Sequence, residues 1–239
     1  MSLEVLKVKD VKKKIHPLDK TLNPALPQHP FLQLLVAPPR SGKTSLLLNL
    51  LFNNNFYNAD DYWHEVWYIS PTQLFDSTCC HYLPKLSNII QIHDPEEIMN
   101  LEEILREIIN GQKKLHKEGE EMKRIYIILD DCVSYLKPIS VLATKYRHHH
   151  LSISIVSQSF RSIPLIVRNC ANSVIFFHLN NMRELEKIDD EYGSNYCSDF
   201  IELAKKYTEK KYNFIHLNND KMIMYHNFSD IIKDCSAKD

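Results

Sequence analysis

Residues 37–44 of the chain read Ala37-Pro-Pro-Arg-Ser-Gly-Lys-Thr44, and an apolar run lies on each side of this stretch. The run before it, residues 31–37, has the length of a buried strand, and the run after it, residues 45–52, continues as a helix would. A loop that ends in Gly-Lys-Thr between a strand and a helix is typical of a phosphate-binding P-loop, in which backbone N–H groups and the helix dipole face a phosphate. The stretch therefore predicts an α/β domain that binds a nucleoside triphosphate.

The residues expected to bind the nucleotide follow one another in this loop: Arg40, Ser41, Gly42, Lys43, Thr44 and Ser45. The Lys43 ammonium is expected to reach the β- and γ-phosphates of ATP, and the Thr44 hydroxyl to bind Mg²⁺. The loop departs from the G-x-x-x-x-G-K-[ST] pattern because Ala37 replaces the first glycine and two prolines follow it. Since proline has no N–H to donate, the phosphate contacts are assigned to the residues from Arg40 onward.

A second stretch, Ile125-Tyr-Ile-Ile-Leu-Asp-Asp131, predicts an apolar strand that ends in two carboxylates. Open α/β sheets bind their ligands at the carboxyl ends of the strands, so both carboxylates are expected near the P-loop. Asp130 is expected to hold Mg²⁺ through water. Asp131 is expected to orient and polarise the water that attacks the γ-phosphate, a task that usually falls to glutamate. The alternative is that two solvated aspartates merely end a strand.

Two further kinds of polar group are expected to act on the γ-phosphate. Residues 151–158 predict a strand beside the P-loop strand, and Gln158 at its end is a candidate γ-phosphate sensor; an ordinary strand-end amide is the alternative. An arginine from a neighbouring subunit can accelerate phosphoryl transfer by about 10³ to 10⁵. The candidates for this arginine in trans are Arg147 as the first choice, Arg161 as the second, and then Arg168 and Arg183.

The rest of the domain alternates short apolar runs with helix-like segments. Runs at residues 66–69 and 173–177 complete the predicted strands, and this alternation favours a mainly parallel central sheet flanked by helices on both faces. The clearest helix is expected to begin at Asp94-Pro95, where a capping residue precedes proline, and to end near Gly111. The charged residues 113–123 are then expected to form a solvated connection.

The two ends of the chain differ from this core. Residues 212–217 and 222–225 flank the turn-forming residues 218–221, which predicts an antiparallel hairpin at one edge of the sheet. Residues 1–29 are rich in lysine and punctuated by proline, and they are assigned to an N-terminal arm that lies outside the core or on a neighbouring subunit. Residues 30–239 are assigned to a single P-loop ATPase domain.

The composition excludes several classes of protein. The 29 basic and 30 acidic side chains leave a net charge of -1, so the chain does not have the basic field of a free-standing DNA-binding domain. Its six cysteines lack C-x-x-C spacing, which argues against a zinc ribbon and a disulfide framework. No apolar leader and no apolar stretch of about 18 residues is found, so a soluble protein without a membrane span is expected.

Short motifs outside the P-loop give the chain a family resemblance. In order along the chain they are His29-Pro-Phe31, Ser70-Pro-Thr72, Leu129-Asp-Asp131, Arg147-His148, Ile153-Ser-Ile-Val-Ser-Gln158, Ile163-Pro164, Ile166-Val-Arg168, Asn169, Phe214 and Asn227-Phe228. With these motifs the chain resembles the viral genome-packaging ATPases of the FtsK–HerA superfamily, in the poxvirus-like group of large DNA viruses and virophages. The resemblance spans residues 29–228, and relatives usually carry glycine where Ala37 stands.

The resemblance implies a RecA-like P-loop NTPase fold of the ASCE type, with the P-loop strand in the centre of the sheet. It implies a homo-oligomeric ring, a pentamer or hexamer, with ATP sites between subunits and double-stranded DNA in the pore. It also implies ATP hydrolysis stimulated by DNA, a capsid portal or vertex protein as partner, and the host cytoplasm, in a viral factory, as location.

Two other functions are open on the residues alone. A P-loop nucleotide kinase would use the same loop but would transfer the phosphoryl group to a nucleotide, whereas tandem carboxylates at a strand end favour water as the acceptor. An inactive P-loop assembly module would keep the fold and bind ATP without turnover.

Overall fold

The computed structural model describes residues 17–20 and 22–233, and within them a nine-stranded sheet runs in the order β3-β2-β4-β5-β1-β6-β7-β8-β9. The strands are β1 (Leu32–Val36), β2 (Glu65–Ile69), β3 (Ile89–Ile92), β4 (Ile125–Asp130), β5 (Leu151–Ser157), β6 (Ser173–Phe177), β7 (Phe214–Asn218), β8 (Ile223–His226) and β9 (Asp230–Ile231). The α-helices are α1 (Lys43–Phe52), α2 (Ala59–Tyr62), α3 (Ser77–Tyr82), α4 (Pro95–Met99), α5 (Leu101–Glu118), α6 (Lys137–Ala143), α7 (Leu165–Cys170), α8 (Met182–Glu191) and α9 (Phe200–Thr208). Short 3-10 turns are η1 (Pro17–Lys20), η2 (Gln73–Phe75), η3 (Leu83–Lys85), η4 (Val133–Tyr135), η5 (Tyr146–His149) and η6 (Gly193–Asn195).

The sheet is parallel from β3 to β6 and antiparallel from β6 to β9. The P-loop strand β1 pairs with β5 on one side and with β6 on the other, so it lies in the centre of the sheet. Strand β5 separates β1 from β4, which is the strand order of the predicted RecA-like fold. The predicted hairpin is β7 and β8, paired antiparallel at one side of the sheet. The fold class expected from the sequence is therefore confirmed.

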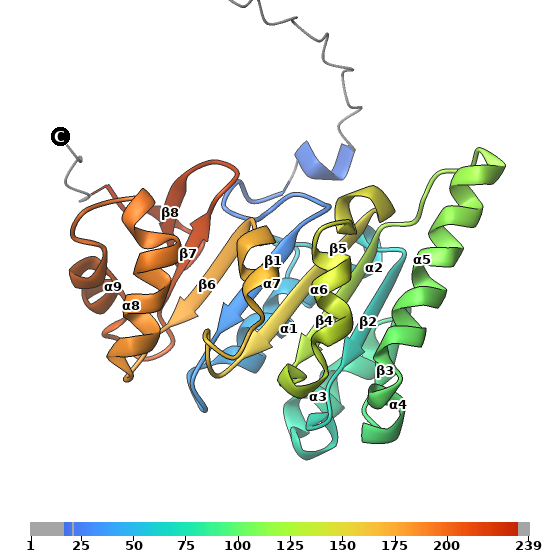
Figure 1. Ribbon diagram of the computed structural model, residues 1–239, viewed down its shortest axis with the longest axis horizontal. Helices are drawn as coiled ribbons and strands as arrows, with labels where there is room; N and C mark the ends of the chain where they lie inside the picture. The colour runs from blue at the N-terminus through green and yellow to red at the C-terminus, as the bar shows by residue number, and fades with distance from the viewer. Residues whose placement is uncertain (1–16, 21, 234–239) are drawn as a thin grey trace, which may run out of the picture.

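Helices cover both faces of the sheet, with α5 to α8 on the near side in Figure 1 and α1 to α3 behind it. Each residue of β1 is buried, and its side chains alternate between the two faces as a strand requires. Leu32, Leu34 and Val36 pack in the core under α5 to α9, whereas Leu35 packs in the core under α1 to α3. A strand buried on both faces explains why residues 31–37 read as an uninterrupted apolar run.

One predicted helix boundary is wrong. The Asp94 carboxylate does cap α4 by accepting a hydrogen bond from the Glu96 N–H, but α5 continues past Gly111 to Glu118. Residues 113–118 are therefore helical, and they are not part of a connecting loop. The helix persists because the buried face of α5 extends to Gln112, and it ends at Gly119, whose φ of 75° suits a left-handed helix cap. Strand β3, a short edge strand, was not predicted.

Part of the expected N-terminal arm packs against the domain. Ala25 and Leu26 are buried, and the Asp19 carboxylate pairs with the Arg124 guanidinium at 2.9 Å. Residues 1–16 and residue 21 of this arm lie outside the described residues. In the described part of the chain, no helix has both the length and the hydropathy needed to cross a membrane.

Candidate nucleotide-binding site

The loop between β1 and α1 has the backbone that its glycine requires. Gly42 has a φ of 105°, in the left-handed region, and it caps the start of α1. A Cβ atom at Gly42 would lie 2.9 Å from Cδ1 of Tyr212, so a larger residue would be strained in backbone and in packing. Arg40 also has a positive φ, of 62°, and its side chain is exposed. The conformation of this loop therefore depends on glycine at position 42, whatever residue stands at position 37.

Lys43 joins the two predicted halves of the site. Its ammonium lies 2.9 Å from Asp130 Oδ1 and 2.7 Å from Asp131 Oδ2. Burial by itself would lower the pKa of Lys43, but the two carboxylates outweigh burial and raise the pKa above its ordinary value. Lys43 is therefore a full cation at neutral pH. The ends of β1 and β4 therefore bring these three residues together at one edge of the sheet, as the sequence predicted.

Asp130 is held by Tyr68, which was not among the predicted site residues. The Tyr68 hydroxyl on β2 donates a hydrogen bond of 2.7 Å to Asp130 Oδ2. Burial, and then the charge of Asp130, raise the pKa of Tyr68 well above its ordinary value, so this phenol keeps its proton and remains a donor. Burial also raises the pKa of Asp130, against the opposing effect of Lys43. The contact fixes one carboxylate oxygen and turns the other toward the P-loop.

Asp131 follows β4 in a left-handed conformation, with a φ of 55°. Aspartate adopts this region more readily than most residues, and here the backbone N–H is held by the Val156 carbonyl at 3.1 Å. The turn brings the half-buried Asp131 carboxylate beside Lys43, where the γ-phosphate of a bound nucleotide is expected. This position suits a group that orients water.

Asp76 is a site residue that the sequence analysis did not single out. Its Oδ2 accepts a hydrogen bond of 2.8 Å from the Thr44 hydroxyl, and its Oδ1 caps α3 by accepting from the N–H groups of Thr78 and Cys79. Burial would raise the pKa of Asp76, but these hydrogen bonds, with Thr44 first, lower it below its ordinary value. Asp76 therefore stays anionic at neutral pH and keeps the Thr44 proton pointed toward itself.

The oxygen atoms at this point suit a hard divalent cation such as Mg²⁺. They come from the Thr44 hydroxyl and from the carboxylates of Asp76 and Asp130. Asp130 Oδ1 faces the Lys43 ammonium at 2.9 Å and has no further partner among the described residues, so it keeps a lone pair for a ligand. The described residues contain no cluster of three or more acidic, histidine or cysteine side chains that could hold a metal by itself. Mg²⁺ is usually held by one or two carboxylates together with substrate phosphates, and this donor set fits that pattern.

The other predicted residues differ in where they lie. Gln158, exposed at the end of β5, lines the same groove as Lys43 and Thr44. Arg161 follows Gln158 at this edge of the sheet and is exposed. Arg147 precedes β5, so it lies at the opposite edge, where it pairs with Asp220 at 3.5 Å. A role in trans stays a prediction for both arginines.

The remaining two arginines differ in burial. Arg168 is buried and makes two hydrogen bonds to the Glu191 carboxylate, at 2.8 and 2.9 Å, so its guanidinium is committed to the interior of its own chain. Arg183 is exposed at the start of α8.

Comparison with known proteins decides the family. A sequence profile described as Poxvirus A32 protein matches residues 21–219. The chain belongs to the poxvirus A32 protein family. The matched residues of this A32-family chain include the P-loop, both aspartates and Gln158. The predicted resemblance to viral genome-packaging ATPases of the FtsK–HerA type is confirmed.

Solved structures share the fold of the A32-family chain. The DNA-packaging ATPase B204 from Sulfolobus Turreted Icosahedral Virus has 18% identity and a TM-score of 0.58, with 83% of this chain and 98% of that chain covered. B204 from Sulfolobus turreted icosahedral virus 2, solved with AMPPCP, has 18% identity and a TM-score of 0.56, with 82% and 96% covered. The conjugation coupling protein TcpA of pCW3, solved with ATPγS, has 14% identity and a TM-score of 0.55, with 78% and 57% covered. A comparison with curated proteins found no match.

The Thr44–Asp76 contact leads to a prediction about metal dependence. In Asp76→Asn the asparagine can still cap α3, but it presents an NH₂ donor to Thr44 where aspartate presents an acceptor. The Thr44 hydroxyl oxygen would then accept this hydrogen bond, and the lone pair it uses would no longer be available to Mg²⁺. We expect the Mg²⁺ concentration that half-saturates binding of a fluorescent, non-hydrolysable ATP analogue to rise about tenfold. Binding of the same analogue in EDTA is expected to stay unchanged.

The matched control for this experiment is Asp94→Asn, because Asp94 caps α4 in the same way but belongs to a different helix. This control is expected to leave the Mg²⁺ dependence at the wild-type value. Equal Mg²⁺ dependence in the Asp76→Asn variant and the wild-type protein would show that Asp76 serves only to cap α3.

Proposed function

We propose that this protein is the ATP-hydrolysing motor subunit that moves double-stranded DNA into a viral capsid. The observation that carries the proposal is the ion pair of Lys43 with both Asp130 and Asp131, at the tips of strands separated by β5. Membership of the A32 family and the fold shared with a DNA-packaging ATPase support the choice of DNA as the translocated polymer.

Each polar group at the site has a role in hydrolysis. The triphosphate takes the place of the carboxylates as partner of Lys43, and the loop from Arg40 to Ser45 supplies backbone N–H donors. Asp131, released from Lys43, accepts a hydrogen bond from the attacking water and turns its lone pair toward the γ-phosphate. Gln158 donates its amide N–H to a γ-phosphate oxygen. Thr44 and Asp130 would hold Mg²⁺, which would supply positive charge beside the phosphate oxygens.

The assembly proposed is a homo-oligomeric ring, a pentamer or hexamer, with the ATP site at the boundary between subunits. Exposure of the groove lined by Lys43, Gln158 and Tyr212 supports a site that a neighbour completes. Arg161 lies at the same edge of the sheet as this groove, whereas Arg147 lies at the other edge, and either can face a neighbour's nucleotide in a ring. The partners are double-stranded DNA and a capsid portal or vertex protein, met in the host cytoplasm.

The test of this function is ATP turnover with and without duplex DNA. DNA-stimulated release of phosphate supports the motor. Transfer of the γ-phosphate to a nucleoside monophosphate, without stimulation by DNA, would instead identify a nucleotide kinase. Tight ATP binding without turnover under either condition would identify an inactive P-loop assembly module.

A further inference from the structure

A groove with a strong positive charge lies between α5 and α6, on a face of the sheet away from the phosphate-binding loop. We call it the basic groove, and its positive side chains are Arg106, Lys113, Lys137 and Lys145, with the His149 imidazole beside them. Glu102 is the single carboxylate among its lining residues in the described chain, and Arg106 already pairs with it at 2.9 Å. Within the described residues the three lysines make no ion pair. Their charge is therefore available to a ligand.

The titration of His149 reflects the same concentration of charge. Burial, followed by the charges of Lys113, His148 and Lys145, lowers the pKa of His149 below its ordinary value. Cations that raise the cost of one more proton create a positive potential within the groove. A ligand with several negative charges would neutralise several of these cations at once, whereas an isolated anion would neutralise only one of them.

The spacing of the charges favours an extended polyanion. Arg106 and Lys113 are two helical turns apart on α5, about 10 Å along its axis. Successive phosphates of one DNA strand advance about 3.4 Å along the duplex, so this span matches about three phosphates. Lys137 and Lys145 bracket α6 on the opposite wall. The groove thus has positive side chains on both walls, and a phosphodiester backbone that lies between the walls could contact both sets.

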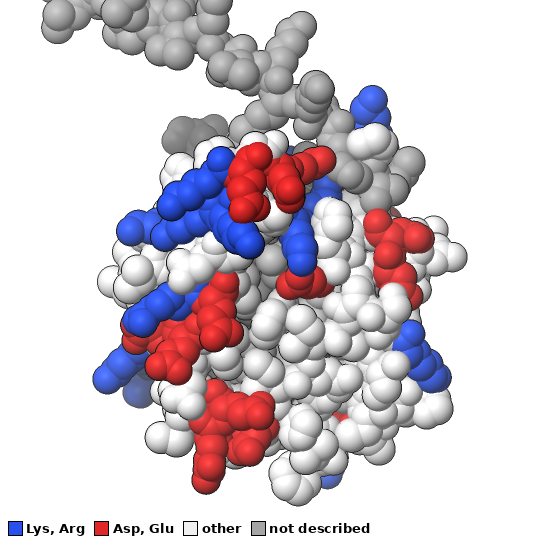
Figure 2. Space-filling model, turned by 90° about the vertical axis from the view of Figure 1, so that its right-hand side faces the viewer, with Lys and Arg blue, Asp and Glu red and all other residues white. Residues whose placement is uncertain are grey.

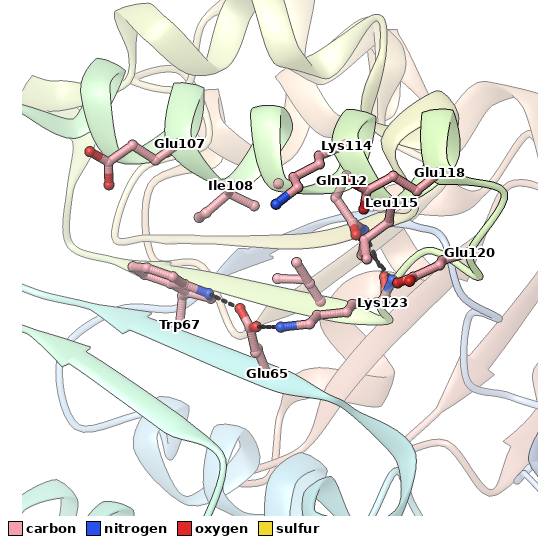
Figure 3. Close-up of a pocket in the computed structure, with 12 residues that line it drawn as sticks. Glu65, Trp67, Glu107, Ile108, Gln112, Lys114, Leu115, Glu118, Glu120 and Lys123 are labelled. Atoms are coloured by element: carbon pink, nitrogen blue, oxygen red, sulfur yellow. Dashed lines mark hydrogen bonds and ion pairs between the residues drawn. The ribbon is translucent and has the colours of Figure 1, made fainter.

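The other side of α5 provides an internal contrast. The groove in Figure 3 lies between α5 and the strands β2 and β4, and its carboxylates are Glu65, Glu107, Glu118 and Glu120. Its two lysines are Lys114 and Lys123, and Lys123 is paired with Glu65 at 2.6 Å. Figure 2 shows charges of both signs interspersed on the face that is turned to the viewer. The helix therefore separates a mainly acidic groove from a basic one.

The walls of the basic groove are connected to the nucleotide site and to the sheet. A short segment that contains turn η4 connects Asp131 to α6, so the chain provides a route from the γ-phosphate side of the site to one wall. On the other wall, the Gln112 amide donates hydrogen bonds to the carbonyls of Lys123 and His149, at 2.7 and 2.8 Å. These bonds fix α5 to the segments that begin β4 and β5. Movement of α6 against a fixed α5 would change the width of the groove.

We infer that the basic groove binds the phosphate backbone of double-stranded DNA and couples this contact to ATP turnover through α6. The inference rests on the proposed function, which supplies DNA as the polymer. It assigns the contact to residues that lie outside the nucleotide site and outside the predicted motifs. Phosphate contacts of this kind position the duplex without reading its sequence.

The experiment compares two double variants of the full chain that carry the same net charge. Lys113→Ala with Lys145→Ala removes two cations from the basic groove, and Lys114→Ala with Lys117→Ala removes two cations from elsewhere on α5. Binding of a fluorescent duplex of mixed sequence is measured as a function of salt. We expect the groove variant to bind about tenfold or more weakly, with the log K against log salt slope reduced by about two. The control variant is expected to retain at least half of the wild-type affinity.

ATP turnover gives the second measurement. The groove variant is expected to keep its basal rate and its melting temperature but to lose stimulation by DNA. Wild-type protein that fails to bind duplex DNA would overturn both this inference and the proposed function. If the wild-type protein binds duplex DNA and both variants bind it equally well, the assignment of DNA binding to the basic groove is overturned. The proposed motor function is not affected by that result. DNA binding that persists in the groove variant while binding of polyglutamate is lost would assign the groove to an acidic protein partner.

Discussion

Lys43→Ala is expected to abolish ATP binding at concentrations that saturate the wild-type protein. The Lys43 ammonium lies within 3 Å of both aspartates, and among the described residues it is the one cation that lines the groove with Thr44 and Asp130. Hydrogen bonds to charged groups contribute about 1.5 to 3 kcal/mol each, and Lys43 is positioned to bond two phosphates. We therefore expect the Kd for ATP to rise at least about a hundredfold, measured by calorimetry or by a fluorescent analogue, and hydrolysis to become undetectable.

The variant also removes the countercharge of the buried Asp130, so its folding must be checked separately. A lower melting temperature is expected, since an uncompensated buried carboxylate destabilises the folded state. The double variant Lys43→Ala with Asp130→Asn removes both charges and is the matched control. Recovery of the melting temperature without recovery of ATP binding would separate the two effects. ATP affinity within about threefold of wild type in Lys43→Ala would place the phosphates away from this loop.

The meeting of the site residues at one edge of the sheet could be predicted because each strand that carries chemistry ends in a recognisable group. The P-loop follows β1, the tandem aspartates end β4, and Gln158 follows β5. Parallel strands bring these ends to one edge of a sheet, so proximity in space follows from topology. The meeting of Lys43 with both aspartates was predictable for this reason.

The contacts of Asp76 and Tyr68 could not be predicted from the sequence. Thr44 and its partner Asp76 are 32 positions apart, and Asp130 and its partner Tyr68 are 62 apart. Nothing in the sequence near either residue differs from an ordinary helix cap or an ordinary core aromatic. Their function becomes visible only when the chain is folded, because β2 lies next to β4 and directs both residues to the site.

The length of α5 was underestimated for a related reason. Gly111 and the charged residues after it suggest the end of a helix, but a helix can expose one face to water while the other is held by packing. Gln112 keeps this part of α5 in place, because its side-chain amide forms hydrogen bonds with the backbone just before β4 and β5. A polar residue that stabilises a helix through distant carbonyls leaves no apolar periodicity to detect. Arg168 is similar, since only its pairing with Glu191 shows it to be internal.

Asp131→Asn is expected to leave ATP binding intact and to reduce turnover by about 10² to 10⁴, the usual contribution of a positioned general base. Asparagine has the same size and tolerates a φ of 55°, so the turn after β4 is preserved. The amide cannot polarise water as a carboxylate does. Binding is expected to be equal or tighter, because Lys43 loses one of the two carboxylates that compete with the phosphates for it.

Single-turnover rates and equilibrium binding of the same Asp131→Asn protein provide the measurement. The matched control is Asp94→Asn, an exposed aspartate that caps α4 away from the site, which is expected to hydrolyse ATP at the wild-type rate. A rate for Asp131→Asn within about threefold of wild type would mean that another group orients the water. Gln158 would then be the first candidate, because it lines the same groove as Lys43 from the neighbouring strand. A weakened affinity with unchanged turnover would instead make Asp131 a binding group, since a residue that acts only on the attacking water contributes nothing to the ground-state complex.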